Sequence, residues 1–230
     1  MALTWLAAAI LAATPIPAAD CQALLGDLYE GPEETELPGL VDGARLDGVA
    51  ALLALRAARD DAPIVVKGGN LAGADFRNAR LSNICFLDTN LAGSDWRGAE
   101  APGLAFVRSD LTGARLAGAR MPNVLLRHPI MKDVDASGAD FSEGRLDGGW
   151  DGSLENLRLD RADLRGFRFD CGITLGDGCP LDRSISFRGA NLTAASLDTY
   201  WGAGEDDWAG AHIDRTIIGL HQLEDTATAN

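Results

Sequence analysis

A hydrophobic residue returns at every fifth position of this chain from Val66 to Leu146, seventeen times without a gap. Because only 47% of the residues are hydrophobic, a run of this length is not accidental. A small residue mostly lies two positions before each member of the series, and Gly or Asn mostly lies two positions after it. The members are Val66, Leu71, Phe76, Leu81, Phe86, Leu91, Trp96, Ala101, Phe106, Leu111, Leu116, Met121, Leu126, Met131, Ala136, Phe141 and Leu146. The period of five is therefore a structural signal.

A period of five fits neither an α-helix nor a flat β-strand. On an α-helix, steps of five advance by about 140°, so the hydrophobic residues would scatter around the helix. On a flat strand, an odd step places alternate members on opposite faces. All members face inward only if the chain bends once per period, and Gly or Asn at the bend supplies the necessary backbone freedom. Successive turns then stack at the strand spacing of about 4.8 Å, so the sequence predicts a solenoid.

Several repeats carry a more specific pattern around the hydrophobic position. The best matches are Ala74-Asp75-Phe76, Ala139-Asp140-Phe141, Ala162-Asp163-Leu164 and Ala190-Asn191-Leu192. The chain thereby resembles the pentapeptide repeat family, whose motif is Ala, then Asp or Asn, then Leu or Phe, then two variable positions. The resemblance implies an all-β solenoid, in the form of a right-handed quadrilateral β-helix with twenty residues per coil. Such an array is specific for the fold and says almost nothing about function.

The first nineteen residues are typical of a secretory signal peptide. Leu3 to Ala13 is apolar, and small residues precede the first charged residue, Asp20. The segment has no Lys or Arg before its apolar run, which departs from the usual form. The apolar run is too short to span a bilayer. We therefore expect cleavage of residues 1–19, no membrane insertion after cleavage, and a periplasmic or secreted location in a bacterium.

Residues 20–63 are expected to form an N-terminal cap that includes a helix. Asp47 is a suitable N-cap for a helix from Gly48 to Asp60, and Pro63 follows it. A solenoid leaves strand edges and an open apolar core at its end, so the expected role of this helix is to cover that end.

Residues 64–220 form the predicted β-helix, and residues 221–230 form a polar tail that we expect to be flexible. The period slips three times, which predicts insertions near residues 148–152, 171–183 and 199–207. Insertions in solenoids emerge as surface loops.

The four cysteines favour disulfide bonds in an exported protein. Cys171 and Cys179 enclose seven residues of one insertion, and a bond between them is our first expectation. Cys21 and Cys85 make the count even, and Cys85 is expected to point outward on an early coil, near the cap that carries Cys21. No C-x-x-C pair is present, so the pattern does not favour a zinc site.

The chain offers no recognisable catalytic or cofactor-binding motif. None of the three histidines, His128, His212 and His221, lies in a known catalytic pattern. The acidic stretch that begins at Asp133 resembles a calcium loop, but Gly144 occupies the position that requires Glu. We therefore expect no enzyme activity, no metal site and no cofactor.

The chain is strongly acidic, with 34 Asp and Glu against 20 Lys and Arg and a net charge of −14. This charge disfavours direct binding to nucleic acid or anionic membrane and favours a protein partner with a basic surface. An alternative is that the charge only maintains solubility.

Two functions follow, and our preference is a non-catalytic exported scaffold, an acidic rod for protein–protein interaction. The alternative is implied by the family resemblance, because some pentapeptide repeat proteins are acidic rods that mimic DNA and inhibit DNA gyrase, a type II topoisomerase. Arg77, Arg80, Arg97, Arg115 and Arg120 interrupt the continuous acid that a DNA mimic would prefer. A third alternative is a cation bridging Asp-rich faces. Trp201 and Trp208 either cover the C-terminal end or form a homodimer there.

Overall fold

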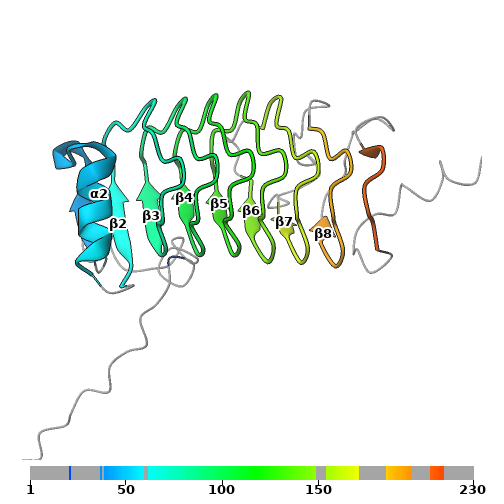
Figure 1. Ribbon diagram of the computed structural model, residues 1–230, viewed down its shortest axis with the longest axis horizontal. Coiled ribbons are helices and arrows are strands. Elements are labelled where there is room, and N and C mark those ends of the chain that lie inside the picture. The colour runs from blue at the N-terminus through cyan, green and yellow to red at the C-terminus, as the bar shows by residue number, and fades with distance from the viewer. Residues whose placement is uncertain are drawn as a thin grey trace, which may run out of the picture.

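The computed structural model describes residues 21, 37, 39–59, 62–148, 154–170, 185–197 and 208–214 of the 230-residue chain. Its central feature is one eight-stranded parallel sheet in which the strands follow chain order from β1 to β8. The strands lie side by side along an elongated molecule, with helix α2 at one end (Figure 1). The elements are β1 Leu40–Asp42, η2 Gly43–Arg45, α2 Gly48–Ala57, β2 Ile64–Lys67, β3 Ile84–Leu87, β4 Ala105–Val107, β5 Leu125–Arg127, β6 Arg145–Asp147, β7 Arg168–Asp170 and β8 Ser196–Leu197.

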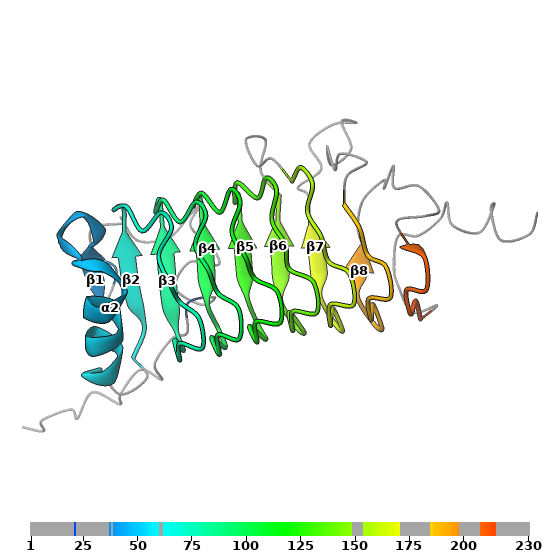
Figure 2. The ribbon, with the colours of Figure 1, turned by 45° about the horizontal axis from the view of Figure 1, so that its top comes forward.

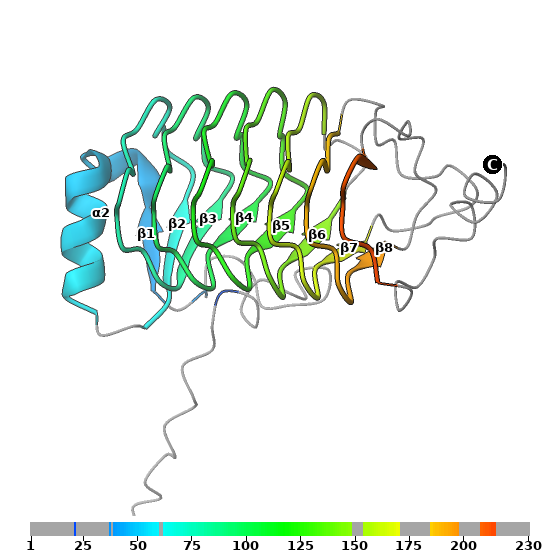
Figure 3. The ribbon, with the colours of Figure 1, turned by 45° about the vertical axis from the view of Figure 1, so that its right-hand side comes forward.

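Three further ladders of single parallel bridges run beside the sheet, so each coil has four sides. The second ladder joins Asn70, Asn90, Asp110 and Ile130. The third ladder joins Asp75, Asp95, Arg115, Asp135, Arg158 and Ser186. The fourth ladder joins Arg80, Glu100, Arg120, Asp140, Asp163, Asn191 and His212. Figure 2 shows the strand side of this stack, and Figure 3 shows the coils from a second direction. The predicted quadrilateral solenoid is confirmed.

The core fills the interior of the coils. All seventeen members of the five-residue series are buried, and none has more than 4% of its surface exposed. The predicted register is thereby confirmed. The aromatic members stack on one another along the axis, as the rings of Phe76 and Trp96 do at a centroid distance of 3.9 Å. At the far end of the described chain, Trp208 stacks on Phe187 with centroids 4.5 Å apart. Trp208 therefore covers the core from the C-terminal side.

The bends occur where the sequence places Gly and Asn. Gly93, Gly113, Asn78 and Asn123 all have a positive φ, two positions after a core residue. A left-handed backbone is inexpensive for Gly and tolerable for Asn, which explains why these residues recur there.

Helix α2 covers the N-terminal end of the coils, where Leu52 is fully buried in the core (Figure 1). It begins at Gly48 as expected and ends at Ala57, short of the expected Asp60. Asp47 occupies the N-cap position, but its side chain accepts no capping hydrogen bond, contrary to our expectation. The stronger anchor is at the other end, where the buried Arg56 donates to the carbonyls of Ala62 at 2.8 Å and Ser82 at 3.0 Å. Arg56 thereby joins the helix to the first coil.

The chain also begins its sheet earlier than predicted. Strand β1 pairs in parallel with β2 and precedes the helix in the chain. The sheet therefore has one more strand on the N-terminal side of the first repeat. Gly43 explains the close fit, because a Cβ at this position would lie 2.0 Å from the carbonyl oxygen of Gly68.

The bridge partners show where extra residues enter the coils. Arg115 pairs with Asp135 at the regular spacing of twenty, but Asp135 pairs with Arg158 and Arg158 pairs with Ser186. Residues are therefore added before Arg158 and again before Ser186. The inserted stretches themselves, Cys171, Cys179, Trp201, the signal-like segment 1–19 and the tail 221–230 lie outside the described residues. Among the described residues, no helix combines the length and apolar character needed to cross a bilayer.

Candidate interaction surfaces

The outer side of the sheet, which we call the sheet face, is apolar over strands β2 to β5. Register places Val65, Cys85, Ala105 and Leu125 in one outward row. Leu87 and Val107 occupy the next outward row, and all six residues are 0 to 2% exposed. Outward residues on the third and fourth ladders are instead mostly charged. This contrast marks the sheet face as a surface that is buried in the folded chain.

Two residues of the N-terminal segment lie in the same cluster. Cys21 is fully buried and Leu37 is 4% exposed, and both pack with the outward row of the sheet face. The structure joins Cys21 to Cys85 by a disulfide with a Cα–Cα distance of 5.6 Å. Cys85 therefore points outward from β3, while its neighbour Phe86 points into the core.

The apolar part of the sheet face ends in a buried ion pair on β5 and β6. Arg127 donates from Nε and Nη2 to Oδ2 of Asp147, at 3.1 and 3.0 Å. Arg145 donates to the other carboxylate oxygen of Asp147. The side chains of Arg127 and Asp147 are only 9% and 11% exposed. The carboxylate thus neutralises the buried Arg127 and the partly exposed Arg145. Removal of its charge would leave Arg127 buried without this partner.

The charged ladders contain a recurring two-point ion pair between an Asp and the Arg two positions later. Arg77 donates from Nε to Oδ1 of Asp75 at 2.9 Å and from Nη2 to Oδ2 at 2.6 Å. Arg97 and Asp95 repeat these distances one coil further. The hydrogen bonds from Arg77 lower the pKa of the Asp75 carboxyl to about 2. The Arg97 side chain likewise lowers the pKa of Asp95.

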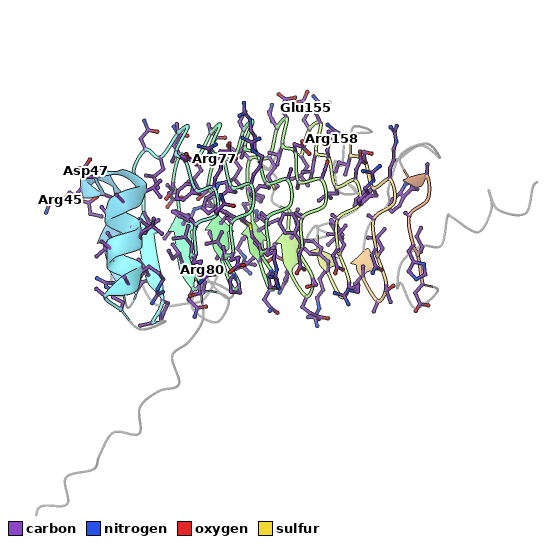
Figure 4. All side chains as sticks on the ribbon, viewed as in Figure 1. Arg45, Asp47, Arg77, Arg80, Glu155 and Arg158 are labelled. Atoms are coloured by element: carbon purple, nitrogen blue, oxygen red, sulfur yellow. A yellow bond between two sulfur atoms is a disulfide. The ribbon has the colours of Figure 1, made fainter. Side chains whose placement is uncertain are left out.

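Ion pairs also connect neighbouring coils. Glu100 lies 3.4 Å from Arg80 below it and 3.8 Å from Arg120 above it. Arg115 approaches Asp95 at 3.9 Å. The five arginines that the sequence places among the acids are thus all paired with acids in this region. Figure 4 shows Arg77 and Arg80 at the surface of the first coil, and Arg158 and Glu155 toward the other end.

The coils formed by residues 64–148 carry no net charge, although the whole chain is strongly acidic. Residues 64–148 contain ten Lys and Arg and ten Asp and Glu. Residues 20–63 contain three basic and ten acidic residues, and residues 149–230 contain seven and fourteen. Each flanking part therefore carries −7, and together they account for the total of −14. The acidic character expected for the rod therefore comes from the segments on either side of residues 64–148, and not from the coils that these residues form.

The residues that the sequence offered for metal binding or catalysis lie in ordinary repeats or at bends where the structure describes them. No group of three or more His, Cys, Asp or Glu residues among the described residues is suited to hold a metal ion. The acidic stretch considered as a calcium loop is ordinary repeat: Val134 and Phe141 are in the core, and Asp133 accepts a hydrogen bond from Asn156 at 2.8 Å. His128 lies at a bend with a φ of 46°, and His212 belongs to the fourth ladder. The two histidines therefore lie on different coils and do not share a site.

A comparison with models of protein families agrees with this architecture. A family model described as pentapeptide repeats matches residues 105–148, with eight copies. A comparison with curated proteins gives no significant match.

Three solved structures illustrate the likeness. QnrB1, a plasmid-mediated fluoroquinolone resistance protein, is 16% identical over 76% of this chain and 87% of its own, with a TM-score of 0.33. A pentapeptide repeat protein from the Arabidopsis thaliana thylakoid lumen is 27% identical over 55% of this chain and 63% of its own, with a TM-score of 0.25. HetL, from the cyanobacterium Nostoc sp. strain PCC 7120 and involved in heterocyst differentiation regulation, is 20% identical over 72% of this chain and 92% of its own, with a TM-score of 0.20.

Proposed function

The chain belongs to the pentapeptide repeat family, and from that premise we propose that it is an exported, non-catalytic scaffold that binds a protein partner. The observation that carries this proposal is the pairing of charges on the third and fourth ladders. Two-point ion pairs hold the side chains of Arg77 and Arg97 against Asp75 and Asp95, so these parts of the ladders are preorganised. Preorganised surfaces lose little entropy on binding, which suits recognition of another folded protein.

The distribution of charge indicates how such a partner would bind. The neutral ladders give no strong field, whereas the flanks carry −7 each and attract a basic surface from a distance. We expect the flanks to increase the association rate and the ladders to provide the contact. Binding should therefore weaken as salt rises, through the association rate more than through the dissociation rate.

Export is supported by the signal-like start and by the buried Cys21–Cys85 disulfide, because structural disulfides persist mainly in oxidising compartments. The test is the intact mass, with and without reductant, of the protein recovered from fractionated source cells. A periplasmic or secreted product that begins near Asp20 and gains mass on reduction is expected. A full-length, fully reduced product in the cytoplasm would contradict export.

The partner is tested by site-specific photo-cross-linking in the same cells. A photoreactive residue at Arg115 on the third ladder should yield a discrete, salt-sensitive adduct, because this position is exposed. The same residue at Val107 is the matched control, since Val107 is buried on the sheet face and should give none. Equal adducts at both positions, or none at either, would contradict the proposed contact surface.

The alternative, a DNA mimic that inhibits DNA gyrase, draws on the net charge of −14 and the family membership. The paired arginines disfavour it, because Glu100 and Asp95 are neutralised where a mimic requires free negative charge. A gyrase supercoiling assay distinguishes the two. We expect no inhibition at equimolar protein, and inhibition that is competed by duplex DNA would establish the alternative instead.

The stacking of Trp208 on Phe187 favours a covering role for this tryptophan over a homodimer at the C-terminal end. Sedimentation of the purified protein addresses this point directly. A concentration-independent monomer is expected, and a dimer would restore the C-terminal interface as a candidate.

A further inference from the structure

The chain contains two apolar clusters that share strands but not side chains. The core cluster is built from inward residues such as Phe86 and Phe106. The sheet-face cluster is built from outward residues of the same strands and from Cys21 and Leu37. Because alternate side chains of a strand point to opposite faces, the core can stay packed when the sheet face is uncovered. The two clusters can therefore be separated by experiment.

We propose that the Cys21–Cys85 disulfide makes the burial of the sheet face depend on oxidation. With the bond closed, Cys21 is held against β3 and Leu37 packs beside it. With both cysteines as thiols, Cys21 and Leu37 leave the cluster and the apolar outward rows face water. The proposal concerns this conformational dependence and deepens the proposed export, since an oxidising compartment supplies the conditions for the closed form.

The chemistry is thiol–disulfide exchange. The Cys21 and Cys85 sulfurs together lose two electrons and two protons, and a disulfide of an oxidising catalyst accepts them and becomes a dithiol. The bond closes a loop with a sequence separation of 64 residues. Because the bond is covalent, it holds Cys21 against β3 far more firmly than the apolar contacts of Cys21 would.

The consequence of an open bond follows from the size and position of the uncovered surface. Val65, Leu87, Ala105, Val107 and Leu125 lie in two adjacent rows and form one continuous patch. Contiguous apolar patches on a soluble protein bind other apolar surfaces, including copies of the same protein. The oxidised protein is thus expected to be monodisperse, and the reduced one to associate.

The test uses purified full-length protein and two matched double variants. Cys21→Ser with Cys85→Ser removes the bond, and Cys171→Ser with Cys179→Ser changes the same number of cysteines elsewhere. In the first variant, fluorescence of a dye that binds exposed apolar surface should rise severalfold, and sedimentation should show concentration-dependent association. Far-ultraviolet circular dichroism should stay that of the wild type. The second variant should match the wild type in all three measurements.

A third variant assigns the signal to the sheet face. Adding Val107→Lys to the Cys21→Ser, Cys85→Ser protein should remove most of the added dye fluorescence and the association. Unchanged dye binding and sedimentation in the cysteine variant would overturn the proposal, as would loss of its β-sheet dichroism, because the clusters would then not be separable. These measurements are made in vitro, so a failure of export in cells would leave their result unaffected and would show separately by fractionation.

Discussion

The ring of Phe106 stacks on the ring of Phe86, its register partner on the preceding coil, with centroids 5.6 Å apart and planes at 12°. Trp96 meets Phe106 edge-on at the same centroid distance, with planes at 90°. Phe86 and Phe106 line the sheet side of two neighbouring coils, and Trp96 lies between them on the side of the third ladder. Stability of the solenoid therefore depends on every coil contributing a large apolar residue.

Replacement of Phe106 by Asp should unfold the stack. Phe106 is 1% exposed, and a carboxylate at this position would lie among aromatic rings with no cation to pair with. We expect a loss of about 4 kcal/mol or more of unfolding free energy, measured by urea denaturation and β-sheet dichroism. Phe106→Leu is the control and should cost about 1 to 2 kcal/mol. A folded Phe106→Asp protein of normal stability would refute the register.

The core could be predicted from the sequence because every fifth residue of these coils points inward, so the period of the hydrophobic residues identifies the core. Whether Leu91 or Trp96 points inward depends only on its place within five residues, and local backbone geometry decides that place. The Asp75 and Arg77 pair is local in the same sense, because Arg77 begins the turn after Asp75 and donates to it from both its backbone N–H and its side chain.

The sheet face could not be predicted in the same way. Burial of Val65 and Val107 on the outside of the coil depends on their contact with Cys21 and Leu37, which are distant in sequence. A signal was nevertheless present, because four outward positions spaced by twenty residues, Val65, Cys85, Ala105 and Leu125, are all apolar. Grouping the outward residues by coils of twenty would have revealed it. Strand β1 was missed for a similar reason, since Leu40–Asp42 is too short to show a period.

The buried pair of Arg127 and Asp147 should contribute more to stability than the exposed pair of Arg108 and Asp88. Both pairs join adjacent coils, but the Arg127 and Asp147 side chains are 9% and 11% exposed and those of Arg108 and Asp88 are 39% and 40% exposed. Asp147→Asn leaves the buried Arg127 without its carboxylate, so we expect a loss of about 3 kcal/mol. Asp88→Asn should cost no more than about 1 kcal/mol.

Urea denaturation of the two variants under one buffer gives this comparison. A third protein, Arg127→Met with Asp147→Leu, removes the buried pair and should recover much of the loss, because the remaining partner, Arg145, has a side chain that is 40% exposed and reaches water. Equal losses of unfolding free energy in Asp147→Asn and Asp88→Asn would show that water reaches the sheet face as readily as the rest of the surface.

The acid stability of the rod should depend on Arg77. The folded-state pKa of Asp75 is about 2, below its ordinary value of 3.8, because Arg77 donates to the ionised carboxylate. A depressed folded-state pKa gives stability that is present above about pH 4 and is lost as the pH falls toward about 2. Arg77→Gln should raise the Asp75 midpoint and flatten the pH dependence of stability in that window.

The Asp75 midpoint is measured from its carboxyl carbon chemical shift during a pH titration. The backbone N–H of residue 77 still donates to Asp75 in the variant, at 3.1 Å in the native chain, so the midpoint should not return fully to 3.8. Lys132→Gln, on a distant coil, is the control and should leave the Asp75 titration unchanged. An unaltered midpoint in Arg77→Gln would mean that the two-point pair does not form in solution.

Ala194 occupies a bend position for which its side chain is poorly suited. Its φ is 56°, whereas equivalent positions such as Gly93 and Gly113 are glycine with a φ of 67°. A left-handed backbone conformation at a residue with a Cβ lowers stability by about 1 to 2 kcal/mol. Glycine removes this strain, but it also makes the unfolded chain more flexible, which offsets part of the gain. Ala194→Gly should therefore stabilise the protein by roughly 0.5 kcal/mol, seen as a higher melting temperature. Ala117→Gly, one position earlier in its repeat and outside the left-handed region, should instead lower stability by roughly 0.5 to 1 kcal/mol. Opposite signs for the two substitutions are the decisive result, since a general preference for or against glycine would move both in the same direction.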